Sequence, residues 1–144
     1  IARRMGDRES EAVALLNLAM ASSGMPPHAC ARLLLQALQG AEAIGSRYVG
    51  LSVLDVAAGL AAATGAWERA ARYFGAAQAQ AASAGVHRDP ADDAFLAPRI
   101  ERARAALPAA AFQLAETAGA ALSYEDVIAD VRDWLETTAV TPPR

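Results

Sequence analysis

Two histidines and one cysteine are the residues of this sequence best suited to hold a transition metal or to act as nucleophiles. His28 and Cys30 are two positions apart, which places them on different sides of a helix, and His87 is distant from both. A structural zinc ion needs four ligands, usually from closely spaced pairs of Cys and His. The sequence therefore predicts no metal site, and one cysteine cannot form an internal disulfide.

Three aspartates follow His87, at Asp89, Asp92 and Asp93. Their carboxylate oxygens are the ligands that hard cations such as Ca²⁺ prefer. Pro90 comes directly after Asp89, however, and this order is typical of a helix start, with Asp as the N-cap and Pro in the first turn. The positive end of the helix dipole would then stabilise the two later aspartates. We favour helix capping over a cation site.

Catalytic motifs are lacking in this sequence. It contains no G-x-S-x-G nucleophile elbow and no paired carboxylates with an evident cleft. All 13 basic residues are arginine, so the sequence cannot supply the lysine of a phosphate-binding P-loop. We therefore predict no catalytic residues, no cofactor and no enzymatic activity, and binding is the remaining class of function.

Polar side chains on the first helix of each predicted hairpin are the candidates for binding. The amide of Asn17 can both donate to and accept from an extended peptide backbone, although a structural hydrogen bond within its own hairpin is the slightly favoured alternative. Arg47 and Asp55 could supply charge. In a second hypothesis, a small molecule lies between the hairpins and the last helices, lined by Tyr48, Tyr73, Phe74 and Phe95. An open polar groove would favour a protein segment, and an enclosed apolar cavity would favour the small molecule.

Helices must position these side chains. Gly6, Gly24, Gly45, Gly65 and Gly85 lie 18, 21, 20 and 20 residues apart, and glycine just past a helix end tolerates the left-handed conformation. Amphipathic segments lie between them, and the 39 alanines favour closely packed helices. Helix one should start at its N-cap Asp7, and Pro98 should kink or split helix five. The predicted helices span about 8–22, 28–44, 46–64, 67–83, 90–107 and 108–119, and a last one starts at Ser123.

Charge and hydropathy restrict the partners. The net charge is −3, and no basic stripe is present, so direct nucleic-acid binding is not expected. No apolar run approaches the roughly 20 residues that a membrane-spanning helix needs, and no signal peptide is visible. We expect a cytoplasmic protein that does not interact with membranes.

The glycine intervals indicate a repeat of about 40 residues. Residues 15–24 align with residues 56–65, and Cys30–Ala37 aligns with Ala70–Ala77 after one inserted residue. These hairpins resemble tetratricopeptide repeats. Together with residues 60–78, 100–107, 111–112 and 121–128, they resemble the C-terminal helical-repeat region of large bacterial signal-transduction ATPases and transcriptional regulators. This resemblance implies an all-α fold of about seven helices, in which antiparallel hairpins stack as a short solenoid.

The resemblance also implies a domain organisation and a role. Residues 1–85 would form the repeat hairpins, residues 86–136 the capping helices of the same domain, and residues 137–144 a frayed tail. The function implied is a non-catalytic sensor or interaction module that binds a protein segment or, alternatively, a small inducer. The opening residues resemble the end of a repeat, so we expect ATPase and output domains upstream in a larger protein. The first helix would then lack its covering repeat, which makes a homodimer through that helix another hypothesis.

Overall fold

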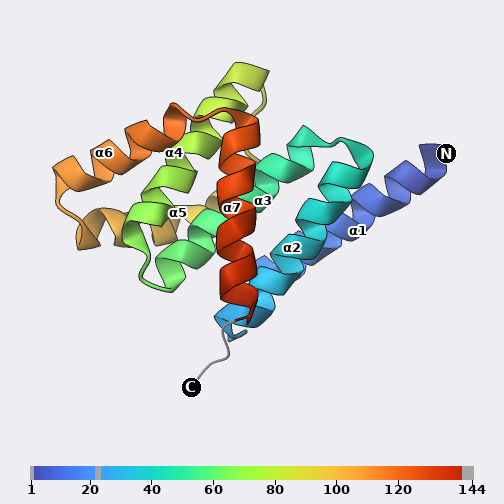
Figure 1. Ribbon diagram of the computed structural model, residues 1–144, viewed down its shortest axis with the longest axis horizontal. Coiled ribbons are helices and arrows are strands. Elements are labelled where there is room, and N and C mark those ends of the chain that lie inside the picture. The colour runs from blue at the N-terminus through green and yellow to red at the C-terminus, as the bar shows by residue number, and fades with distance from the viewer. Residues whose placement is uncertain (1, 22–23, 141–144) are drawn as a thin grey trace.

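The computed structural model describes residues 2–21 and 24–140, with side chains described from Gly6 onward, and this part of the chain contains seven α-helices and no strand (Figure 1). It is therefore all-α, as predicted. None of the described helices combines the length and the apolar character that crossing a bilayer requires. The helices are α1 (Ala2–Ala21), α2 (Pro27–Ile44), α3 (Arg47–Ala63), α4 (Trp67–Ala84), α5 (Pro90–Ala106), α6 (Ala109–Ala120) and α7 (Tyr124–Val140).

The middle helices begin and end where the sequence predicts. Gly45, Gly65 and Gly85 have positive φ angles of 66°, 81° and 69°, so three of the five glycines close a helix in the left-handed conformation. Ser46 caps α3 by accepting a hydrogen bond from the backbone N–H of Val49 at 3.2 Å. Ser123 caps α7 in the same way, accepting from Asp126 at 3.1 Å. The structure thus confirms the predicted bounds of α2 to α5 to within one or two residues.

Of the two outcomes expected for Pro98, a kink or a split, the split does not occur, since α5 continues from Pro90 to Ala106. Two predictions about helix ends are wrong. Helix α1 begins at Ala2, so Gly6 and Asp7 lie inside it rather than at a turn and an N-cap. Helix α7 continues to Val140, so residues 137–140 are helical rather than frayed, and residues 141–144 lie outside the described residues. Good helix formers at residues 2–5 extend α1 beyond the boundary that we identified. In α7, Ala139 is buried against the core, and this packing outweighs the low helix propensity of Thr137, Thr138 and Val140.

The first four helices form two hairpins, α1 with α2 and α3 with α4, and α3 also packs against α2 and α5. Figure 1 shows α1 to α4 following one another as adjacent antiparallel rods. Helix α3 is the centre of the core, because an unbroken run of its residues, Val53–Ala62, is buried. Burial on all sides explains why α3 has apolar residues around most of its circumference.

Helix α6 packs along α4 instead of pairing with α5, its neighbour in sequence. Glycines on both helices permit this contact: a Cβ on Gly75 would collide with the backbone of Glu116, and a Cβ on Gly119 would collide with the backbone of Arg72. Only glycine allows two helix backbones to approach so closely. The prediction that helix six ends near Gly119 is confirmed, because α6 ends at Ala120, and Gly119 is buried in its last turn.

Helix α7 lies across α2 and also contacts α3 and α4, in front of them in Figure 1. The ring of Tyr124 rests on α3 at Gly50, where any Cβ would overlap the tyrosine hydroxyl. Farther along, Trp134 meets Tyr73 of α4 edge to face, with ring centroids 5.9 Å apart. One side of the hairpins is thus covered by α7, and the opposite side carries the features described next.

Candidate functional site

Two connected depressions lie where α1, α3 and the start of α5 meet. The larger one, here called the outer hollow, has a volume of about 240 Å³ and is lined from α1 by Val13, Leu16 and Asn17. The smaller one, the inner recess, has a volume of about 20 Å³ and extends toward α4, with Leu51, Asp55, Ala77, Ala81, Val86, His87 and Arg88 in its wall. Tyr48, Ser52, Asp89 and Asp92 line both.

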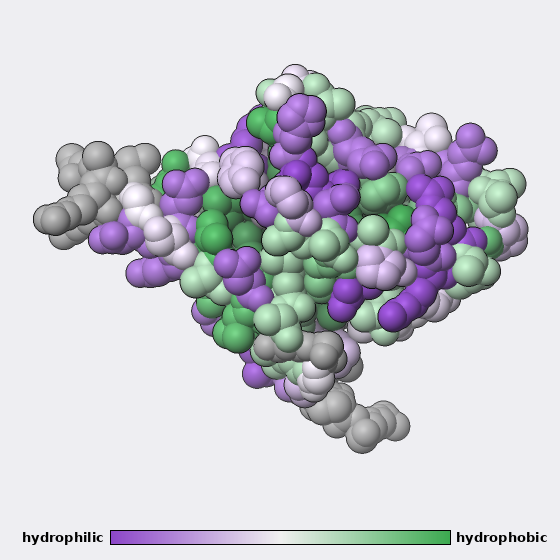
Figure 2. Space-filling view, turned by 180° about the vertical axis from the view of Figure 1, so that it is seen from behind, coloured by the Kyte–Doolittle hydropathy of each residue, from purple (hydrophilic) through white to green (hydrophobic). Residues whose placement is uncertain are grey.

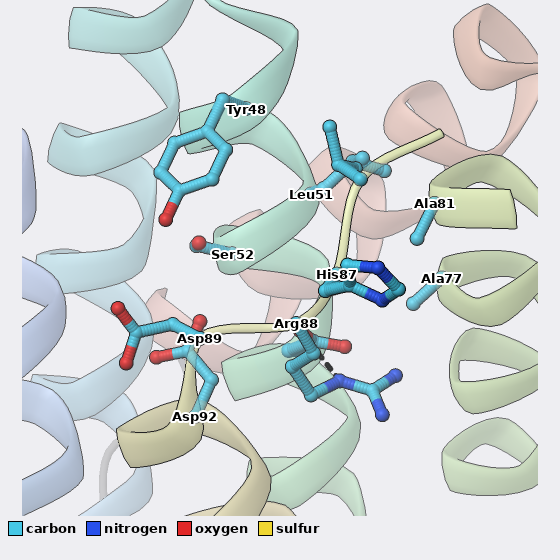
Figure 3. A pocket seen from close by; sticks show the side chains of 11 residues that line it. Tyr48, Leu51, Ser52, Ala77, Ala81, His87, Arg88, Asp89 and Asp92 are labelled. Atoms are coloured by element: carbon cyan, nitrogen blue, oxygen red, sulfur yellow. Dashed lines mark hydrogen bonds and ion pairs between the residues drawn. The ribbon is translucent and has the colours of Figure 1, made fainter. Parts of the chain in front are cut away.

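The loop between α4 and α5 shapes the inner recess. Gly85 ends α4 in the left-handed conformation, and residues 86–89 then run across α3 (Figure 3). Asp89 starts α5 by accepting a hydrogen bond from the backbone N–H of Ala91 at 2.8 Å, so helix capping is confirmed for this residue. This path places Arg88 over α3 and brings Asp89 and Asp92 beside Tyr48 and Ser52 in Figure 3.

Asp55 is a buried carboxylate in the wall of the recess, with its side chain 8% exposed. Arg88, itself 15% exposed, donates from Nε to Asp55 Oδ2 at 3.0 Å. Burial raises the pKa of Asp55 from 3.8 to about 6, because desolvation penalises the charged form more than Arg88 stabilises it. Oδ1 of Asp55 is also buried, yet it has no hydrogen-bond partner. A buried acceptor without a partner is costly and marks the place where a donor is missing.

Asp92 is the second buried carboxylate here, and this residue is 7% exposed. Burial raises its pKa, the Ser52 side chain opposes the shift by hydrogen bonding, and the charge of Asp89 adds to it. Asp93, by contrast, is largely exposed and lies 3.6 Å from Arg88. The recess therefore has three carboxylates in its wall, those of Asp55, Asp89 and Asp92, but one guanidinium. The carboxylates therefore outnumber the guanidinium in this wall, to which His87 also contributes.

Asn17 and Tyr48 border the outer hollow, as candidate binding residues should. Asn17 is exposed, and the alternative of a structural hydrogen bond within its own hairpin stays a prediction. Tyr48 is about half exposed, as is Leu18 of α1. Figure 2 views the molecule from the side away from α7, and it shows hydrophobic side chains beside the N-terminal helix next to hydrophilic ones. This side offers both apolar contact and hydrogen bonding.

Arg47 and Tyr73 lie elsewhere. Arg47 is exposed and pairs with Glu125 of α7 at 2.8 Å, with its guanidinium 4.5 Å from the centre of the Tyr124 ring. Tyr73 is fully buried, and its hydroxyl contacts Arg69 and Asp130. Burial raises the pKa of Tyr73 to about 12. Both residues join α7 to the hairpins, and neither lines the outer hollow or the inner recess.

The four aromatic residues of the small-molecule hypothesis are dispersed. Tyr48 lines the outer hollow, Tyr73 is in the core, and Phe74 is buried between the guanidinium groups of Arg88 and Arg104. Phe95 lines a separate cavity of about 70 Å³ and stacks with Arg99. An enclosed aromatic pocket does not form from these residues.

The sequence interpretation missed Ser52 and Arg88 as members of a site, and it favoured a helix-capping role for Asp92. His87 joins the inner recess, whereas Cys30 is buried beside Phe95 in the separate cavity. Within residues 2–21 and 24–140, no three His, Cys, Asp or Glu side chains are grouped so that they could hold a metal ion. One available signal was Asp55, a charged residue within the apolar run of α3, since buried charges usually have a partner.

Comparisons with protein families, with curated proteins and with solved structures found no match.

Proposed function

We propose that this chain is a non-catalytic helical-repeat module that binds a protein segment along the outer hollow. The observation that supports this most is the outer hollow itself, built from α1, α3 and the start of α5, with hydrogen-bonding groups from Asn17, Tyr48 and Ser52. Stacked hairpins offer such a surface on one side, because the first helix of each hairpin follows the first helix of the previous one. Helices α1, α3 and α5 are in contact in that order.

The shape of the site favours a segment over an enclosed small molecule. Small-molecule sites bury most of their ligand in pockets of several hundred cubic ångströms, and the outer hollow and inner recess together are smaller than that. An extended segment needs only part of its surface covered, with pockets for some side chains and hydrogen bonds for its backbone. We further propose, on the resemblance of its repeats, that the module belongs to a bacterial multidomain regulator or signalling ATPase and biases its other domains.

A peptide selection tests this function. A library of random linear peptides is selected against the purified chain, and the backbone amides that move on binding are mapped by two-dimensional ¹⁵N NMR. We expect the largest shifts at Asn17, Tyr48 and Ser52. Replacement Ser52→Arg should block binding by filling the hollow, and Ser83→Arg, an exposed position of the same residue type on α4, is the matched control. A library without binders, or binders that map to α6 and α7, would refute the proposal.

A further inference from the structure

The lining of the inner recess indicates which side chain of a bound segment would enter it, and this inference rests on the function proposed above. We propose that the inner recess receives the side chain of a lysine from the bound segment. Its ammonium group would be held by Asp55 and Asp92, beyond the outer hollow where the backbone of the segment lies.

The unpartnered oxygen of Asp55 is the first argument. The Asp55 side chain is more than nine-tenths buried in the wall of the recess, Arg88 occupies only its Oδ2, and Oδ1 accepts no hydrogen bond. Leaving such an acceptor unsatisfied costs free energy that an incoming donor would recover. A hydrogen-bond donor is therefore the group that this wall lacks.

Charge defines that donor as a cation. Asp55, Asp89 and Asp92 all line the recess, and Arg88 is the one arginine among its lining residues. Arg88 is already engaged, at 3.0 Å from Asp55 and at 3.6 Å from Asp93. An anionic ligand would add to this negative charge, and a neutral one would leave it uncompensated. A cationic donor would both neutralise the excess negative charge and donate a hydrogen bond to the free acceptor.

Size separates lysine from arginine. A volume of about 20 Å³ holds about one water-sized group, which suits a compact ammonium but not a planar guanidinium. The methylene groups of the lysine stem would lie in the outer hollow, where Val13, Leu16 and Tyr48 offer apolar contact. The recess thus has room for the ammonium group, beside the carboxylates of Asp55 and Asp92.

The lysine must come from outside the residues of this sequence. All basic residues of this sequence are arginine, so a second copy of it cannot insert a lysine. A free amine has the same chemistry as a lysine side chain. We commit to a protein segment because the recess opens into the outer hollow through shared residues, which leaves room for the backbone of a peptide.

The test uses three acetylated and amidated peptides that differ only in a central lysine, arginine or norleucine between alanines, and n-butylammonium chloride as the free amine. Binding is followed by ¹⁵N NMR titration at the backbone amides of Ser52, Asp55 and Arg88. We expect the lysine peptide to bind at least about tenfold more tightly than the other three probes, because a buried polar site discriminates strongly against ligands that leave it unpaired. Equal affinity of the three peptides would overturn the inference, and n-butylammonium binding as tightly as the lysine peptide would overturn the commitment to a protein segment.

Variants locate the effect. Asp92→Asn should weaken the lysine peptide by about tenfold through lost charge pairing, and Asp133→Asn, which removes the same charge from an exposed site on α7, should not. Ala81→Leu should block the recess without altering charge and keeps the test decisive should Asp92→Asn perturb folding. Wild-type affinity in both Asp92→Asn and Ala81→Leu would overturn the inference. Library peptides that bind the outer hollow without any lysine would also overturn it, yet would leave the proposed function standing.

Discussion

Asp130 and Asp55 both pair with arginine, and their surroundings differ in a way that separates structure from binding. Asp130 of α7 has partners at both oxygens: Oδ1 accepts from Arg69 at 3.1 Å and from Tyr73 at 3.2 Å, and Oδ2 is 3.1 Å from Arg72. Asp55 has a partner at one oxygen only. The carboxylate of Asp130 is satisfied and fastens α7 to α4, although Nε of Arg72 in the same cluster is buried without a partner. The carboxylate of Asp55, beside a cavity, is not satisfied.

This comparison indicates where function should be sought in a helical domain without catalytic motifs. Both clusters are partly or fully buried, and both perturb a pKa, that of Tyr73 in one and that of Asp55 in the other. A perturbed pKa alone therefore does not identify a site. The distinguishing observation is the free carboxylate oxygen of Asp55, since Arg69 and Arg72 also border a hollow, of about 400 Å³. We expect changes in the Asp130 cluster to lower stability without affecting peptide binding. Changes at Asp92 should weaken peptide binding without lowering stability.

The largest expected effect is on the α4–α6 contact that supports the Asp130 cluster. Gly119→Ala places a methyl group against the backbone of Arg72, and we expect a loss of about 3 kcal/mol in the free energy of unfolding. Gly40→Ala is the control, since its methyl would meet Ala12 at an ordinary 3.5 Å, and relief of a helical glycine should raise stability by about 0.5–1 kcal/mol. Urea denaturation of both variants measures the difference. Equal stability of the two would show that α6 does not pack on α4 through its glycine.

The pH dependence of stability should reveal that burial destabilises the charged form of Asp55. Its pKa is about 6 in the folded protein against an ordinary 3.8, so the folded state binds this proton more readily than the unfolded chain. This group therefore stabilises the fold below pH 3.8 and loses that contribution as the pH rises through about 6. Between about pH 4.5 and pH 7 the unfolding free energy of the wild type should fall by about 2 kcal/mol relative to that of Asp55→Asn.

Chemical denaturation of both proteins at several pH values measures this relative change. Asp92→Asn is the second variant for comparison, because the charges of Asp92, Asp93 and Arg88 all act on the pKa of Asp55. Parallel pH profiles for wild type and Asp55→Asn would mean that Asp55 keeps an ordinary pKa. The argument for an electrostatically unsatisfied recess would then lose its support.

A smaller effect is expected at Asp130. Asp130→Asn removes the charge that Arg69 and Arg72 share, and since these side chains are about one-third exposed, we expect a loss of about 1.5 kcal/mol. Asp133→Asn on the same helix removes an equal charge from an exposed site and should change stability little. Thermal unfolding compares the two, and NMR titration should show unchanged binding of the lysine peptide in both. Weakened binding in Asp130→Asn would end the separation of the two clusters.

Local signals made much of the fold predictable. Gly45, Gly65 and Gly85 end helices because a left-handed residue is required there, and Asp89 followed by Pro90 starts one. The packing of α6 on α4 was not predictable, because Gly75 meets the backbone of Glu116, and Gly119 meets that of Arg72, across an intervening helix in the sequence. Such contacts leave no periodic pattern in the sequence.

The site was predictable only in part for a related reason. Asn17 and Asp55 were candidates because they lie on the first helices of the hairpins, and Tyr48 was one as an aromatic lining residue. Arg88 and Asp92 join them in the depressions through the path of a loop. Arg47 was misplaced by one position: each residue turns about 100° around a helix, so Tyr48 borders the outer hollow while Arg47 faces α7. The charge of a side chain indicates what it can bind, but the side of the helix on which it lies decides whether it can reach the ligand.

Arg47 accordingly gives the smallest effect and the sharpest check on that direction. Arg47→Ala removes an ion pair whose two side chains are 63% and 71% exposed, and such pairs contribute little because water screens them, so we expect a stability change below about 0.5 kcal/mol. The variant should bind the lysine peptide like the wild type, whereas Tyr48→Ala, one residue along, should bind it less tightly because it removes a wall shared by the outer hollow and the inner recess. NMR titration of the two variants decides the point. A loss of binding in Arg47→Ala would place the bound segment on the α7 side of α3, and the outer hollow would no longer be its site.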